Sequence, residues 1–152
     1  MGDQKPPRLA AGERETLLAL LRYQRASVLR KVEGLDDDAA GASPVASGTS
    51  LRWVVAHLAT AESVWVEQRF AGGAAHAVEP GTLADAVAAY RRTSDRVDAV
   101  VAASDLDDLC LADASDPPVN LRWVLAHLLE ETARHAGHAD VLRELHDGTV
   151  GR

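Results

Sequence analysis

Apolar residues recur along this chain at intervals of three and four, the spacing that places them on one face of an α-helix. Four segments show this pattern, at about 12–33, 50–70, 82–103 and 120–146. No segment shows the strict alternation of apolar and polar residues that is typical of a strand. Long helices without strands bury their apolar faces against one another. We therefore predict an all-α protein, folded as a single four-helix bundle domain over residues 1–152.

Capping and breaking residues mark the predicted helix ends. Either Thr49 or Ser50 is expected to cap the second helix and Asn120 the fourth, because their side chains accept hydrogen bonds from free backbone N–H groups. The stretch 34–48 is rich in Gly, Asp, Ala, Ser and Pro and is predicted to be a loop. The loops between helices are about ten to fifteen residues long, enough to cross the end of a bundle. The pattern alone leaves the topology open.

Two of the predicted helices begin alike. The sequence SLRWVVAHLA at 50–59 matches NLRWVLAHLL at 120–129, an offset of 70 residues. Each places a tryptophan four residues before a histidine, so that the two rings lie one helical turn apart. The match is too short for a repeat architecture, but it predicts that both helices start in the same way.

The fourth helix carries the most informative pair of polar residues. Glu131 and His135 lie one turn apart, on the same side of the helix as Leu128 and Leu142. A charged group that points into a protein core is normally paired or bound to a metal, because burying it alone is costly. We therefore predict that this carboxylate and imidazole face the interior, where they could hold a metal ion.

The second helix adds a candidate ligand. A helical projection places His57 on one side with Trp53 and Val64, which we take as the interior, whereas Glu62 and Val66 point away. Bundles usually build metal sites from side chains on facing helices. We therefore expect His57 to meet the pair on the fourth helix.

Together, His57, Glu131 and His135 would form a two-histidine, one-carboxylate set. That set occurs in catalytic zinc sites and in non-haem iron sites. Two more histidines lie nearer the edge of the same face: His127 could bind the metal or support Glu131, and His138 could be a fourth ligand or contact a substrate. The alternative is a set of core-edge histidines satisfied by hydrogen bonds without a metal.

Other aromatic and histidine residues receive simpler interpretations. Trp53, Trp65 and Trp123 are expected to be core residues or pocket walls, with substrate stacking as the alternative. His76 and His146 are expected to be solvated.

Composition limits the partners. The formal net charge is −7, which argues against nucleic acid because phosphate contacts require clusters of Lys and Arg. No apolar run reaches the length of a signal peptide or a membrane span, so we expect no membrane contact and a cytoplasmic location. A single cysteine, Cys110, excludes an internal disulfide and a Cys-rich zinc site, and we expect it to be passive.

Two segments resemble the DinB-like superfamily of metal-binding four-helix bundles: HLATAESVW, which begins at His57, and EETARHAGHADVLREL near the C-terminus. Family members typically carry one histidine on the second helix and His-x₃-His on the fourth. Here Glu131 replaces the first histidine of that pair and His138 stands where glutamine is common. This departure resembles the mycothiol-dependent maleylpyruvate isomerase branch, and it implies His57, Glu131 and His135 as the metal ligands. The resemblance also implies an up-down-down-up topology and a homodimer.

The implied function is a divalent-metal-dependent transferase that uses a low-molecular-weight thiol such as mycothiol on a small electrophile. Zinc is the first choice of metal, with nickel, manganese and iron as alternatives. In this interpretation His138 or His127 carries a proton, Arg143 or Arg134 holds an acidic group of the thiol, and Trp53 contacts the cofactor. The alternative function is a non-catalytic metal- or ligand-binding bundle with a stress-related accessory role.

Overall fold

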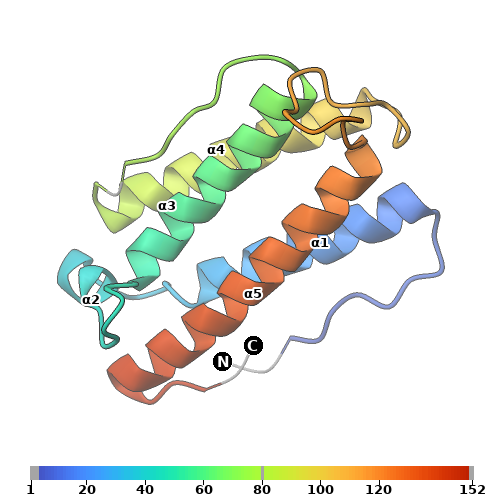
Figure 1. The fold of residues 1–152 in the computed structure, drawn as a ribbon. Coiled ribbons are helices and arrows are strands. Elements are labelled where there is room, and N and C mark those ends of the chain that lie inside the picture. Colours follow the sequence, from blue (N-terminus) through green and yellow to red (C-terminus); the bar gives the residue numbers. More distant parts are fainter. Residues whose placement is uncertain (1–3, 80, 151–152) are drawn as a thin grey trace.

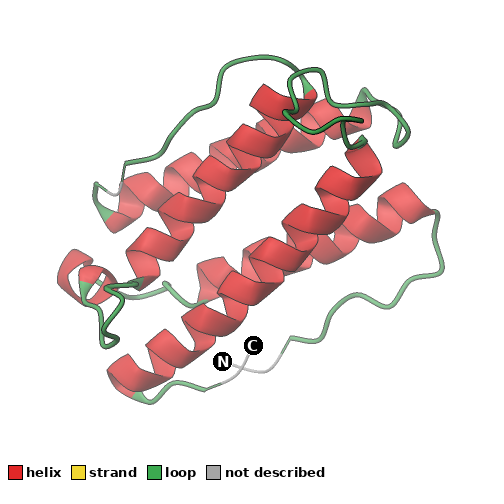
Figure 2. Ribbon diagram, in the orientation of Figure 1, coloured by secondary structure: helices red, strands yellow, loops and turns green. Residues whose placement is uncertain are grey.

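A computed structural model describes residues 4–79 and 81–150 of the chain (Figures 1 and 2). Within these residues the structure is helical and contains no strand, as predicted. The long helical segments are α1 (Glu13–Arg30), α3 (Leu51–Glu62) with its continuation η1 (Ser63–Phe70), α4 (Leu83–Ala102) and α5 (Leu121–Asp147). A short helix, α2 (Asp37–Gly41), precedes α3.

The helices form a bundle with up-down-down-up topology (Figure 1). Helices α3 and α4 run in the same direction, because residues 71–79 return along the bundle before α4 begins. Helices α1 and α5 run in the opposite direction, and α1 packs on α5 as α3 packs on α4. Helix α3 also packs against α5, which makes these two helices antiparallel neighbours. The implied topology is confirmed, and the α3–α5 contact positions the candidate site.

The two matching sequences start their helices in the same way, as predicted. The side chain of Ser50 accepts a hydrogen bond from the backbone N–H of Trp53, and Asn120 accepts one from Trp123. Each cap therefore satisfies one of the free N–H groups of a helix N-terminus. Of the two candidates for the second helix, Ser50 is the cap.

Three predicted elements differ from the structure. Helix α1 ends at Arg30, three residues early, where the chain turns toward Gly34 in the left-handed conformation (φ +76°). The predicted loop after it contains α2, a single turn capped by the side chain of Asp36. The predicted helix 50–70 changes at residue 63 into the π-helix η1, in which hydrogen bonds span five residues, as in Ala71 N–H to Val66 C=O (2.9 Å).

The interior side of α3 also differs from the projection. Glu62 and Val66, predicted to point away from the interior, are both 0% exposed. Burial of Glu62 is possible because Arg25 of α1 binds both carboxylate oxygens, at 2.8 and 2.7 Å. Arg25 also donates to Asp98 of α4 at 2.8 Å, so one guanidinium joins three helices. Burial opposes the charge on Arg25, but these carboxylates outweigh it and raise the pKa of Arg25, whereas burial raises the pKa of Glu62.

Cys110 is buried, and burial raises the pKa of its thiol, which fits the passive role predicted for it. Among the described residues, no helix combines the length and the apolar character needed to cross a bilayer.

Candidate metal site

Three side chains from two helices converge where α3 and α5 pack against each other. His57 lies on α3, and Glu131 and His135 lie one turn apart on α5. The Glu131 Oε1 atom is 2.9 Å from His57 Nε2 and 3.2 Å from His135 Nε2. One ligand atom from each residue lies within 4.8 Å of the other two. The predicted meeting of these residues is therefore confirmed in its geometry.

The set fits a divalent cation. Nitrogen and oxygen ligands lie about 2.0–2.2 Å from zinc, so two adjacent ligands of one ion are separated by about 2.8–3.6 Å in octahedral or tetrahedral geometry. The two short distances to Glu131 Oε1 fall at this separation. The rings of His57 and His135 lie 4.7 Å apart between centroids, and each presents Nε2 to the same carboxylate oxygen.

The ionisation of the site also suits a cation. Burial opposes the charge on Glu131, but the hydrogen bond from His57 and the charge of His135 outweigh it, so the pKa of Glu131 lies below its ordinary value. Burial lowers the pKa of His135. A carboxylate and a neutral imidazole are the forms that bind a metal, and the two pKa shifts favour these forms of Glu131 and His135.

The site lies at the surface of the bundle rather than in its interior, which corrects the prediction that these side chains face the core. The side chains of His57, Glu131 and His135 are 32%, 24% and 12% exposed. The apolar neighbours Leu128 and Leu142 are buried. The site therefore lies at the boundary between the buried face of α5 and the solvent. Partial exposure leaves room for a ligand to approach, as catalytic metal sites require.

Trp53 supports the histidine on its own helix. Its ring stacks on His57, with 4.6 Å between the ring centroids and 11° between the planes, and it lies 5.9 Å from the ring of His135. Trp53 is 40% exposed, so it is neither a core residue nor fully buried. This stack fixes the plane of the imidazole and leaves one face of the indole open.

His138 lies beside the three-residue set without joining it. Its Nδ1 atom is 3.5 Å from Nδ1 of His135. On its other side, His138 lines a pocket of about 300 Å³, whose other lining residues are Val45, Ser47, Thr49, Val141 and Leu142. This histidine therefore lies between the candidate metal site and a mainly apolar pocket.

The other predicted site residues lie apart from the set. His127 lies one turn before Glu131 and stacks on Trp123. Arg143 donates hydrogen bonds to the carbonyl oxygens of Lys31 and Glu33, just after the end of α1. These bonds connect α5 to the segment that follows α1. Arg134 is exposed on α5. The roles predicted for these residues stay predictions.

One polar network, between η1, α4 and the segment after η1, was missed from the sequence. Glu67 of η1 accepts hydrogen bonds from Arg96 (2.6 Å) and Ser63 (2.6 Å), and His76 lies 3.3 Å from it. His76 is exposed as predicted, yet its backbone N–H donates to Ser63 at 2.7 Å. The spacing of four residues between Ser63 and Glu67 was a visible signal for part of it, but the contacts of Arg96 and His76 are long-range. The network ties the segment after η1 to the π-helix.

Fold and site together define a DinB-like helical bundle with a candidate His–Glu–His metal site between two antiparallel helices. The chain belongs to the mycothiol-S-transferase family, whose sequence profile matches residues 16–148. That match includes all three residues of the candidate site.

A solved structure supports the fold. The crystal structure of a conserved protein from Enterococcus faecalis superposes with a TM-score of 0.70, covering 92% of this chain and 100% of that one, at 15% sequence identity. At this identity the likeness concerns the fold alone. A search of curated protein sequences gives no match.

Proposed function

We propose that this protein is a divalent-metal-dependent S-transferase, which joins a low-molecular-weight thiol of the mycothiol type to a small electrophile. The observation that carries the proposal is the convergence of His57, Glu131 and His135, all partly exposed, in a chain of the mycothiol-S-transferase family. We assign these three residues as the ligands. The charge and the nitrogen-rich ligand set favour zinc, with iron, nickel and manganese as alternatives.

A bound divalent cation lowers the pKa of a coordinating thiol and so supplies a thiolate near neutral pH. The proton of the thiol then needs an acceptor, and His138 is placed for it, beside His135 and open to solvent. The thiol sulfur forms a bond to the electrophilic carbon while the bond from that carbon to the leaving group breaks. The leaving group departs with the electron pair, and His138 returns the proton to it or to water.

The surroundings of the site suit two organic reactants. The pocket beside His138 lies on one side of the three ligands, and the rings around His127 lie on the other. A free thiol cosubstrate requires a reducing compartment, which favours the cytoplasm. We retain the homodimer implied by the resemblance as part of this proposal.

Elemental analysis and a turnover assay test the proposal together. Freshly purified protein should contain about one divalent metal per chain and should consume monochlorobimane only when both mycothiol and metal are present. The Glu131→Gln variant should lose the metal and the turnover, because it removes the charge that both histidines share. Glu130→Gln, one residue away and exposed, is the matched control and should keep both.

Two results would point elsewhere. Stoichiometric metal without turnover, over a panel of thiols and electrophiles, would support the non-catalytic metal-binding bundle instead. Absence of metal in protein purified without chelators or affinity tags would contradict the ligand assignment and, with it, the proposed chemistry.

A further inference from the structure

A second group of rings joins η1 and α5, starting one turn before Glu131 on α5. Trp65 of η1 and Trp123 and His127 of α5 pack together with 4.8–5.2 Å between ring centroids. The guanidinium carbon of Arg69 lies 4.1 Å from the centroid of Trp65. We call these four residues the aromatic cluster. The proposed reaction gives none of them a defined role.

The aromatic cluster repeats the arrangement of the candidate metal site. In the metal site Trp53 stacks on His57 at 4.6 Å and 11°, and in the cluster Trp123 stacks on His127 at 5.0 Å and 15°. These four residues are the Trp and His of the two matching sequences, 70 positions apart. Because α3 and α5 are antiparallel, the two sequences lie at opposite ends of the α3–α5 contact, and each faces the later part of the other helical segment.

The same offset relates the remaining members. His135 of the metal site corresponds to Trp65 of the cluster. The ring of His135 lies 4.7 Å from that of His57, at 58° between the planes. The ring of Trp65 lies 4.8 Å from that of His127, at 65°. Glu131 corresponds to Ala61. The two groups therefore relate by an approximate local two-fold axis between the helices. Without a carboxylate and with an indole in place of an imidazole, the cluster cannot hold a divalent cation.

In place of metal ligands, the aromatic cluster presents indole rings and one positively charged guanidinium, that of Arg69. Trp123 is 44% exposed, and Arg69 is partly exposed. Among residues 4–79 and 81–150, none of the ion pairs within 4.0 Å involves Arg69. An indole face binds planar aromatic groups, and a guanidinium stacked on an aromatic ring still offers N–H donors to an anion. Ring and charge together select a planar anion.

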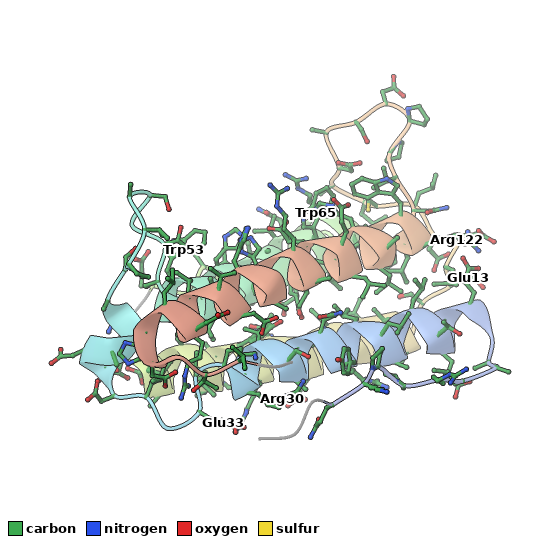
Figure 3. All side chains as sticks on the ribbon, turned by 90° about the horizontal axis from the view of Figure 1, so that it is seen from below. Glu13, Arg30, Glu33, Trp53, Trp65 and Arg122 are labelled. Carbon is green, nitrogen blue, oxygen red and sulfur yellow. The ribbon has the colours of Figure 1, made fainter. Side chains whose placement is uncertain are left out.

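The position of the cluster relates it to the proposed reaction. The labelled Trp53 and Trp65 lie on the same side of the bundle, and the loops before α3 and before α5 rise on that side at its two ends (Figure 3). His127 and Glu131, one turn apart, have Cβ atoms about 5–6 Å from each other. His127 is one turn and Trp123 two turns from Glu131, so a ring held on the cluster would lie within about two helical turns of the candidate ligands.

We propose that the aromatic cluster is the subsite for the electrophilic substrate, and that this substrate is a planar aromatic compound with a negatively charged group. The ring packs on the exposed parts of Trp123 and His127, and Arg69 binds the anionic group. The identification of the ligand as the electrophile rests on the proposed S-transferase function. The binding itself requires neither the metal nor the thiol.

Calorimetric titration of the metal-free, full-length protein tests the binding directly. Naphthalene-2-sulfonate should bind, whereas cyclohexanesulfonate, which lacks an aromatic face, and naphthalene-2-sulfonamide, which lacks the charge, should bind about tenfold more weakly. Trp123→Leu and Arg69→Gln should each weaken naphthalene-2-sulfonate binding about tenfold. The matched controls are Trp53→Leu, the corresponding tryptophan of the metal site, and Arg92→Gln on α4, and both should bind as the wild type does.

Three outcomes would overturn the proposal: no binding of naphthalene-2-sulfonate, equal binding by Trp123→Leu and the wild type, or an equal loss in Trp53→Leu. Light scattering on the same samples adds a fourth, since a dimer that Trp123→Leu converts to a monomer would make a second copy of the chain the occupant of this surface. Circular dichroism of each variant checks that it is folded. Because the titration contains no metal and no thiol, its failure is distinct from a failure of the proposed transfer reaction.

Discussion

His138 shows how one side chain can belong to a site without binding its metal. Its Nδ1 atom lies 3.5 Å from Nδ1 of His135. The same residue also lines the apolar pocket. A ligand role and a proton-transfer role therefore make different demands on it. A ligand must reach the position shared by His57, Glu131 and His135, and the ligand-atom group within 4.8 Å contains only those three among the described residues.

Replacing His138 separates the two roles. In His138→Gln we expect the metal content to stay at the wild-type level, because the three ligands are intact. We expect kcat to fall about a hundredfold, the usual contribution of a positioned acid or base, while KM for the thiol changes little. Metal analysis and steady-state kinetics measure the two effects. Loss of metal from this variant would instead make His138 a ligand.

The residues of the candidate site could be predicted from the sequence, but their surroundings could not. The spacing of Glu131 and His135 and the motif around His57 indicated the set because helical periodicity fixes which side chains share a face. The projection of α3 failed because it took the side of His57 as the interior, whereas the apolar face lies on the side of Glu62. A glutamate is expected at the surface, and its partner Arg25 is 37 positions away.

At the scale of elements, η1 is the least predictable part of the fold and is held by long-range contacts. A π-helix changes the register by one residue per turn, which leaves no distinct period over eight residues. The side chain of Glu67 receives hydrogen bonds from Arg96 of α4 and from Ser63, at the start of η1. The helix α2, five residues long, is likewise shorter than any periodic pattern can indicate.

These contacts predict a pH dependence. Burial opposes the charge on Glu67, but hydrogen bonds from Arg96 and Ser63 outweigh it and hold the pKa of Glu67 below its ordinary value of 4.5. A carboxylate whose pKa is lower in the folded state stabilises the fold fully above pH 4.5, and this stabilisation is lost as the pH falls through the lower folded value.

Glu67→Gln should therefore lower the free energy of unfolding by about 1 kcal/mol at pH 7 and by less at pH 3. Urea denaturation at the two pH values measures the difference, with Glu130→Gln as the exposed control. An equal loss at both pH values would show that the charge of Glu67 is not what stabilises the turn between η1 and α4.

At the scale of the whole molecule, the candidate metal site lies between two helices, α3 and α5, that the apolar core connects only in part. Buried residues form two apolar clusters, one around Val54 and Tyr90 and the other around Val66 and Leu125. Helix α5 packs extensively on α1 and less on α3. The carboxylate of Glu131 and the ring of His57 meet across the weaker of these contacts, so an ion bound there would add a cross-link between the two halves of the bundle.

Metal binding should accordingly raise the thermal stability of the protein. A ligand that binds only the folded chain stabilises it by about 2.7 kcal/mol at a hundredfold excess over Kd, which corresponds to about 5–10 °C in Tm for a domain of this size. Scanning calorimetry of chelator-treated protein, before and after addition of zinc, measures this shift.

His57→Ala should abolish the response, because it leaves both remaining ligands on α5, where an ion no longer connects two helices. Trp53→Leu should keep a reduced response, since the three ligands remain but the stack that orients His57 is lost. A full zinc response in His57→Ala would mean that the ion binds along α5 alone. No metal held between α3 and α5 would then be present to position a thiol.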